Sequence, residues 1–204
     1  TLSEDQFAGY KFDRIISNPP FGIDWKREQK AVESEAKLGE NGRFSAGLPK
    51  ISDGQQLFVL NGLSKLAEDG KMAIVQNGSP LFSGDAGSGS SEIRRYMLEN
   101  DWLEAIIQLS TDQFMNTGIA TYIWVLSKNK RPERKGKVQL IDASAIFHRL
   151  RKGLGDKKNE ITAADRTVIT KLYADFAEND LVKIYDNDFF LYREYTVMQP
   201  LQRS

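Results

Sequence analysis

The chain has 204 residues, enough for one domain with a sizeable hydrophobic core, and its hydrophobic fraction of 40% is ordinary for a globular protein. The 28 basic and 28 acidic residues balance, so nucleic acid would have to be attracted by local patches or by a partner. The absence of cysteine excludes disulfides, thiolate metal sites and a cysteine nucleophile, and the one histidine, His148, cannot build a zinc site alone.

The first predicted strand covers residues 14–17 and ends abruptly at Asn18-Pro19-Pro20-Phe21. Two prolines cannot continue a strand ladder, so the chain must turn there. The Asn18 amide oxygen and the Pro19 carbonyl can accept the two hydrogens of an exocyclic amine, while the Phe21 ring stacks on a planar substrate. A simple Asn-Pro turn is the alternative. Ligands bind at the carboxyl ends of strands in open α/β sheets, which favours the substrate site.

Residues 24–53 are polar and contain glycine, and they predict a long loop with a short helix within residues 26–38. Loops of this length are usually functional or disordered, so we expect mobility in the absence of substrate. A helix follows over residues 56–66, where leucines recur at helical spacing, and should end at Asp69-Gly70. Residues 72–75 are expected to form a buried strand.

Residues 84–91 are rich in glycine and serine and predict a mobile loop. Ser90 or Ser91 is expected to cap a helix that runs to Glu99. Further strands are expected over residues 103–109, 121–126 and 138–141, where apolar, β-branched and aromatic side chains cluster.

Thr162 and Asp165 have the spacing of a capping box and predict a helix through Phe176. The alternation of strands and helices indicates an α/β fold with a mostly parallel sheet. Residues 189–198 are rich in aromatic side chains and are expected to be ordered. The chain also opens at Thr1 without a methionine and reaches a strand soon afterwards. These features indicate an excised piece of a larger protein.

Two groups of basic residues have no assigned role. The first comprises Lys128, Lys130, Arg131, Arg134, Lys135 and Lys137, and the second comprises Arg149, Arg151, Lys152, Lys157 and Lys158. Solvated loops are the simple explanation for both groups. Contacts with phosphates or with another subunit are the alternatives. His148 is expected to be a structural or surface residue.

Several segments together resemble the modification (methyltransferase) subunit of type I restriction-modification systems. The resemblance covers most of the chain and rests on SNPPFGIDWK (residues 17–26), GLP (47–49), NGSPLF (77–82), GDAGSG (84–89), EIRR (92–95), NDWLEA (100–105), FMNTGIAT (114–121) and residues 136–144. The motif at residues 18–21 alone is shared with other methyltransferases, whereas the whole series is typical of this family.

The resemblance implies a Rossmann-like, doubly wound sheet of seven strands, the last antiparallel, that uses S-adenosylmethionine. Family members place the cofactor-binding glycine motif before the catalytic loop. The main cofactor motif is therefore expected upstream of Thr1, and the cofactor-binding residues of this chain are unknown.

Residues 1–150 would be the substrate-facing, C-terminal half of the sheet, and residues 151–204 a C-terminal extension. The strand at 14–17 would pair with residues 72–75 and leave its other edge open. The chain alone should therefore self-associate and bind S-adenosylmethionine weakly or not at all.

The resemblance also implies N6-methylation of adenine in DNA, with the target base flipped out of the duplex. Asn18, Pro19, Pro20 and Phe21 would form the catalytic loop. Phe114 precedes the late strand at which the family places a second stacking aromatic, and it either stacks on the other face of the base or packs in the core. No metal is expected.

The implied partners are DNA, a specificity subunit that reads the sequence, and a restriction subunit, in the cytoplasm and away from membranes. Two alternatives stay open. One is a methyltransferase with the same motif that acts on a protein glutamine or an RNA guanine, which the long segment 24–53 and the C-terminal extension disfavour. The other is a non-catalytic assembly module, since the chain alone is expected to be inactive without the cofactor motif.

Overall fold

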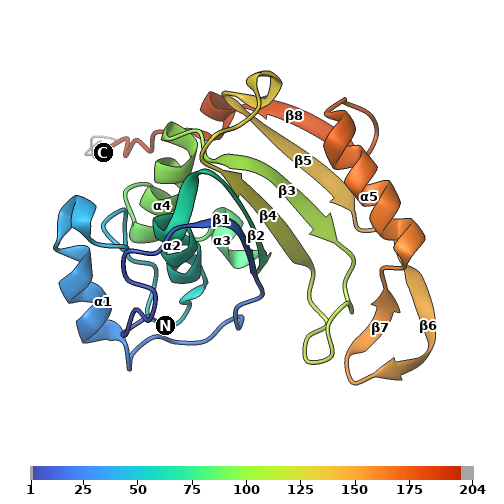
Figure 1. The fold of residues 1–204 in the computed structure, drawn as a ribbon, viewed down its shortest axis with the longest axis horizontal. Helices are drawn as coiled ribbons and strands as arrows, with labels where there is room; N and C mark the ends of the chain where they lie inside the picture. The colour runs from blue at the N-terminus through green and yellow to red at the C-terminus, as the bar shows by residue number, and fades with distance from the viewer. Residues whose placement is uncertain (1, 199–204) are drawn as a thin grey trace, which may run out of the picture.

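A computed structural model describes residues 2–198 of the chain, and its centre is one six-stranded sheet with the order β1-β2-β4-β3-β5-β8 (Figure 1). These strands are β1 (Phe12–Ser17), β2 (Leu66–Asn77), β3 (Leu103–Leu109), β4 (Thr121–Ser127), β5 (Lys137–Ala143) and β8 (Val182–Asp186). A separate two-stranded hairpin consists of β6 (His148–Leu154) and β7 (Lys157–Glu160).

The helices are short and flank the sheet. They are α1 (Gln29–Ala36), α2 (Gln55–Lys65), α3 (Ser79–Phe82), α4 (Gly89–Glu99) and α5 (Ala163–Asp175), with 3-10 turns at Gly39–Asn41, Pro132–Arg134 and Asn187–Phe190. The helix α5 has 13 residues. Within residues 2–198, no helix has the length and apolar character needed to cross a membrane.

The sheet is mixed rather than mostly parallel. β1 pairs with β2 and β3 pairs with β5 in parallel, whereas β4 runs antiparallel to β2 and β3, and β8 antiparallel to β5. The antiparallel β4 agrees with the antiparallel strand of the implied fold. The expected pairing of β1 with β2 is confirmed, since Ile15 lies opposite Met72. β1, β2, β3 and β5 therefore end at the same edge of the sheet.

Neighbouring residues of β4 contribute to two different hydrophobic cores. Trp124 and Leu126 pack with α2 and α4, whereas Val125 packs with Ile169 of α5. Successive side chains of a strand point to opposite faces. The helix α5 therefore covers the face of the sheet opposite α2 and α4, on the side of β5 and β8 (Figure 1).

Residues 24–53 are folded, contrary to the expectation of a long loop. The expected short helix is present as α1, and the side chains of Trp25, Val32 and Phe44 are buried in the core. The Trp25 indole N–H donates a hydrogen bond to the carbonyl of Lys50 at 3.0 Å. Apolar side chains spaced through a polar segment thus fasten it to the face of the sheet that carries α2.

Most helix boundaries follow the sequence signals, with two exceptions. Ser88 caps α4 in place of Ser90 or Ser91, and its Oγ accepts the N–H of Ser91. The helix α2 stops short of its expected end because β2 begins directly after it. The capping box at the start of α5 is confirmed, since the Thr162 and Asp165 side chains each accept the other's backbone N–H.

The first basic group is partly structural. Lys130 is 3% exposed, and its Nζ donates to Asp101 Oδ1 at 2.6 Å. Arg134 is also 3% exposed, donates to Gln139 Oε1 at 2.9 Å and lies 4.4 Å over the ring of Tyr173. Neither solvated loops nor phosphate contacts explain these two residues. The group lies in the connection from β4 to β5, at the edge of the sheet opposite the end of β1.

The division of the chain at residue 150 stays a proposal. The strand β6 runs across this position, and β8, which follows it in sequence, joins the main sheet through β5. Residues on the two sides of the division therefore share one sheet.

Two expectations from the sequence concern the ends of the chain. Thr1, upstream of which the main cofactor motif is expected, lies outside the described residues. Residues 199–204 of the proposed extension also lie outside them. The position of the cofactor motif therefore stays a prediction.

The strand β1 forms one edge of the sheet and leaves apolar surface open. Ile16 is 90% exposed and borders a hollow of about 630 Å³ that Ile123 and Ile169 also line. The aromatic run near the end of the chain begins at the other edge, where Phe189 stacks on Tyr185 of β8. It does not begin near the open edge of β1.

We expect the chain in isolation to self-associate through β1, because an uncovered apolar strand edge pairs readily with a second copy. Ile16→Lys should lower the apparent mass in light scattering, since a charge on an edge strand opposes such pairing. The control Val168→Lys, at an exposed position of α5, should leave the mass unchanged. A strictly monomeric wild-type chain throughout a dilution series would contradict the prediction.

Asp101→Asn should lower the free energy of unfolding by about 3 kcal/mol at pH 7, because the buried Lys130 ammonium loses its counterion. Burial opposes ionisation of Asp101, but hydrogen bonds from Lys130, the Gly136 N–H and Asn187 outweigh it and lower the pKa of this carboxyl. A lowered pKa stabilises the fold above about pH 4, and this contribution disappears as the pH falls through the folded-state pKa.

The difference between wild type and Asp101→Asn in urea unfolding should therefore be smaller at pH 3 than at pH 7. An equal difference at the two pH values would show that the Asp101 charge does not stabilise the fold.

Candidate active site

The turn after β1 places polar groups at the surface. The strand ladder ends at Ser17, and Asn18 is exposed while Pro19 is buried. Gly22 has a φ of +62°, in the left-handed region that glycine adopts without strain, and it turns the chain away from the sheet. The turn therefore holds the Asn18 side chain at the carboxyl end of β1, where α/β sheets bind ligands.

The structure brings Phe21 and Phe114 together. Their ring centroids are 6.2 Å apart and the ring planes meet at 84°, an edge-to-face contact. Phe114 lies in the connection from β3 to β4 and is half-buried, outside both hydrophobic cores. The contact thus joins Phe21, three residues after Asn18, to a segment more than 90 residues away, and a base could enter between the rings only after one of them turns.

The segment after the turn is tied to the start of α2. The Gly54 N–H donates to the carbonyl of Ile23 at 3.1 Å, and the Trp25 N–H donates to the carbonyl of Ile51 at 3.1 Å. Residues 23–25 therefore leave the candidate site along a fixed path beside α2.

A buried amide pair supports this arrangement and was missed by the sequence analysis. Gln55 is 1% exposed, its Nε2 donates to Asn77 Oδ1 at 2.9 Å, and its Oε1 accepts the Asn77 N–H at 2.9 Å. Asn77 Oδ1 also accepts the N–H of Ser79, and Gln55 Nε2 also donates to Asp53. The sequence shows only an Asn at a strand end and a Gln at a helix start. Nothing in these two separate positions predicts that their side chains form hydrogen bonds with each other.

The candidate site offers hydrogen-bond acceptors and aromatic surface rather than metal ligands. In the described part of the chain, no group of three or more His, Cys, Asp or Glu side chains is placed to hold a metal ion. The sole histidine lies away from the turn, where it pairs with Asp165 at the start of α5. The chemistry available at the turn is therefore the orientation of a planar, amine-bearing substrate.

Comparison with protein families shows the family to which the chain belongs. The model of the N-6 DNA Methylase family matches residues 1–193. The chain belongs to this family. The match includes the turn at residues 18–22, the amide pair and the connection that carries Phe114.

Relatives of this N-6 DNA methylase chain are methylase subunits. It is 32% identical over 143 residues to the type I restriction enzyme MpnII methylase subunit of Mycoplasma pneumoniae, covering 69% of this chain and 24% of that protein. It is 29% identical over 147 residues to the HindI methylase subunit of Haemophilus influenzae, covering 72% of this chain and 30% of that protein. The chain thus spans less than a third of the length of these two relatives.

A solved structure supports the fold assignment. The methyltransferase subunit of a type I restriction-modification system from Streptococcus thermophilus superposes with a TM-score of 0.76 at 27% sequence identity. The superposition covers 92% of this chain and 37% of that subunit. The α/β methyltransferase fold expected from the sequence is therefore confirmed.

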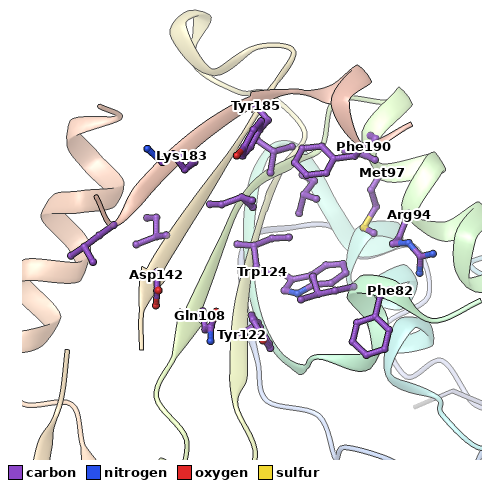
Figure 2. Close-up of a pocket in the computed structure, with 18 of the residues that line it drawn as sticks. Phe82, Arg94, Met97, Gln108, Tyr122, Trp124, Asp142, Lys183, Tyr185 and Phe190 are labelled. Carbon is purple, nitrogen blue, oxygen red and sulfur yellow. The ribbon is translucent and has the colours of Figure 1, made fainter. Parts of the chain in front are cut away.

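A separate apolar cavity of about 620 Å³ lies between α4 and the strands β3, β5 and β8. Figure 2 shows the Trp124 indole near its middle, with Met97 on one side and Asp142 on the other. The Trp124 indole N–H is buried without a hydrogen-bond partner in the described residues. None of residues 18–22 lines this cavity, so it is distinct from the candidate site.

Gln55→Leu should lower the free energy of unfolding by about 2 kcal/mol, because the Asn77 backbone N–H loses its acceptor and Asn77 Oδ1 loses one of its two donors. Urea unfolding measures the change, and Gln6→Leu, at an exposed position, is the matched control with little expected effect. A Gln55→Leu chain as stable as the control would show that the amide pair does not hold this edge together.

Proposed function

We propose that the chain forms the substrate-facing part of a type I modification subunit, which methylates the N6 amine of adenine in DNA. The observations that carry this proposal are the exposed Asn18 at the carboxyl end of β1 and the contact between Phe114 and Phe21, which follows Asn18 by three residues. Membership of the N-6 DNA methylase family and the similarity to type I methylase subunits support it. The whole protein's activity remains a proposal because the chain spans only part of its relatives.

The proposed role of the turn is to position the amine of a flipped adenine. The Asn18 amide oxygen accepts one hydrogen of the amine and the Pro19 carbonyl accepts the other, since a proline carbonyl at a turned strand end is free of ladder pairing. These two bonds favour a pyramidal nitrogen whose lone pair points at the methyl donor. Positioning of this kind can supply a large part of the lowering of the barrier.

The aromatic rings hold the base in the proposed complex. Phe21 stacks on one face and Phe114, after turning out of its present edge-to-face contact, on the other. Stacking on an aromatic side chain contributes about 1–3 kcal/mol per base. Pro20 keeps the backbone between Asn18 and Phe21 in its turned conformation, because its ring fixes φ.

S-adenosylmethionine, when bound, supplies a methyl group already activated by the sulfonium charge. The described residues fit one wall of such a site: Asn18 and Pro20 are exposed, and the open edge of β1 lies directly beside them. The amine nitrogen would form a bond to the methyl carbon as the sulfur–methyl bond breaks, with the sulfur keeping the electron pair, and the nitrogen would then release a proton to water. A strong general base is not needed, and the one histidine of the chain pairs with Asp165.

The proposed partners are DNA together with the specificity and restriction subunits, acting in the cytoplasm. The alternatives with the same motif, a protein-glutamine or an RNA-guanine methyltransferase, agree less well with the relatives found. A purely structural assembly module does not account for the exposed Asn18 beside two aromatic rings.

Asn18→Ala in the complete, assembled enzyme should reduce methylation of hemimethylated DNA by about 100-fold or more, as expected when one orienting hydrogen bond is lost. DNA binding should change little, because phosphate contacts supply most of the affinity. Methyl transfer from labelled S-adenosylmethionine and a gel-shift assay give the two readouts.

The control is Asn41→Ala, at an exposed position in the 3-10 turn Gly39–Asn41, which should methylate as the wild type does. If Asn18→Ala methylated within a few-fold of wild type, the role of the turn would be wrong. Transfer to a glutamine-bearing peptide, with none to DNA, would favour the alternative enzyme.

A further inference from the structure

The hairpin β6–β7 carries concentrated positive charge. From His148 to Glu160 the sequence contains five Lys and Arg residues against two acidic residues, whereas the whole chain is balanced. Six of the seven residues of β6 are exposed. Figure 1 shows the hairpin projecting beyond the main sheet.

The hairpin is fastened to the connection that carries Phe114. The Asp156 N–H, near the hairpin tip, donates to the carbonyl of Met115 at 2.9 Å. Further along β7, the N–H groups of Lys158 and Asn159 donate to the carbonyl of Asp112 at 2.9 and 3.0 Å. These bonds bracket Phe114 on both sides, so the hairpin and the backbone that carries Phe114 are held together.

Further contacts fix the base of the hairpin. The buried Asn159 side chain donates to the carbonyl of Thr111 at 2.9 Å. His148 Nδ1 lies 2.9 Å from Asp165 Oδ2, the carboxylate that also closes the capping box of α5. The basic side chains are therefore presented by a rigid support, although they are themselves exposed.

The chemistry of the hairpin surface favours phosphates over a protein partner. Of the eight exposed residues of the hairpin other than glycine, four are Arg or Lys and two are acidic. Leu154, 57% exposed, is the one large apolar side chain exposed on the hairpin. Duplex DNA carries about one negative charge per 1.7 Å of its axis. The seven residues of β6 extend about 23 Å, enough to pass several phosphates.

The hairpin also lies at the same edge of the sheet as the candidate site. It contacts the connection that follows β3, at the edge where β1 ends in the catalytic loop. The first basic group lies at the opposite edge, with Lys130 and Arg134 buried in ion pairs and ring contacts. The two basic groups look alike in the sequence, but only the second lies at the edge of the sheet where DNA would bind in the proposed function.

We propose that the β6–β7 hairpin is a phosphate-binding arm that holds the DNA duplex beside the flipped base. This inference rests on the proposed function, because it requires a duplex at the catalytic loop. Arg151 and Lys152, both exposed in β6, are the side chains expected to contact the DNA backbone.

The test replaces Arg151 and Lys152 by glutamine in the complete, assembled enzyme. The control replaces Arg131 and Lys135, an exposed Arg and Lys of the first basic group, by glutamine. DNA affinity is measured by fluorescence anisotropy from 0.05 to about 0.3 M salt, where each lost phosphate contact lowers the slope of log K against log salt by about 0.9. Arg151→Gln/Lys152→Gln should bind at least about 10-fold more weakly at 0.1 M salt, with a slope reduced by about 1 to 2.

The control should keep the wild-type affinity and slope, and both variants should keep the wild-type melting temperature. An unchanged slope in Arg151→Gln/Lys152→Gln, with wild-type methylation of DNA intact, would overturn the inference and leave the proposed function standing. Loss of a copurifying subunit with an unchanged DNA slope would also overturn it, and would make the hairpin a protein-docking element. A wild-type enzyme that neither binds nor methylates DNA would refute the proposed function and the inference together.

Discussion

The end of β1 sets the arrangement of the site. Pro19 and Pro20 stop the hydrogen-bond ladder one residue after Ser17, whereas β2 continues to Asn77. The strand β2 therefore extends past the end of β1, and the exposed Asn18 follows the last residue of β1. A chain that must turn at this point also directs residues 23–25 against α2, whose first residue, Gln55, in turn fixes the end of β2. The backbone chemistry of two prolines thus determines where the polar groups of the site can lie.

Sequence reasoning succeeded where the signal was local. The strand before Asn18 and the capping box at Thr162 were each recognisable from adjacent residues. It failed where stability comes from distant segments. The polar hairpin β6–β7 is held by backbone bonds to the connection after β3, and β8 is held by pairing with β5. The hairpin lacks the apolar alternation that predicts a strand, and β8 shows it over only Val182, Lys183 and Ile184.

The same limit applies to polar residues. Gln55 and Asn77 are 22 residues apart, and Lys130 and Asp101 are 29 apart, so neither pair could be recognised without the fold. A run of basic residues predicts exposure only on average. Lys130 became a buried counterion because the connection from β4 to β5 passes over Asp101. Burial and charge pairing are decided by topology, which a single sequence does not specify.

The edge-to-face contact of Phe21 with Phe114 means that the empty site is already occupied by its own side chains. Such a contact is worth about 0.5–1.5 kcal/mol, comparable with the stacking energy of one base. In the proposed function, a free adenine nucleotide would gain little by displacing Phe114 from Phe21. A base that belongs to a duplex is held in place by contacts elsewhere on the DNA. Those contacts can offset the energy needed to separate Phe114 from Phe21. The aromatic pair would then favour a base held by a duplex over a free adenine nucleotide.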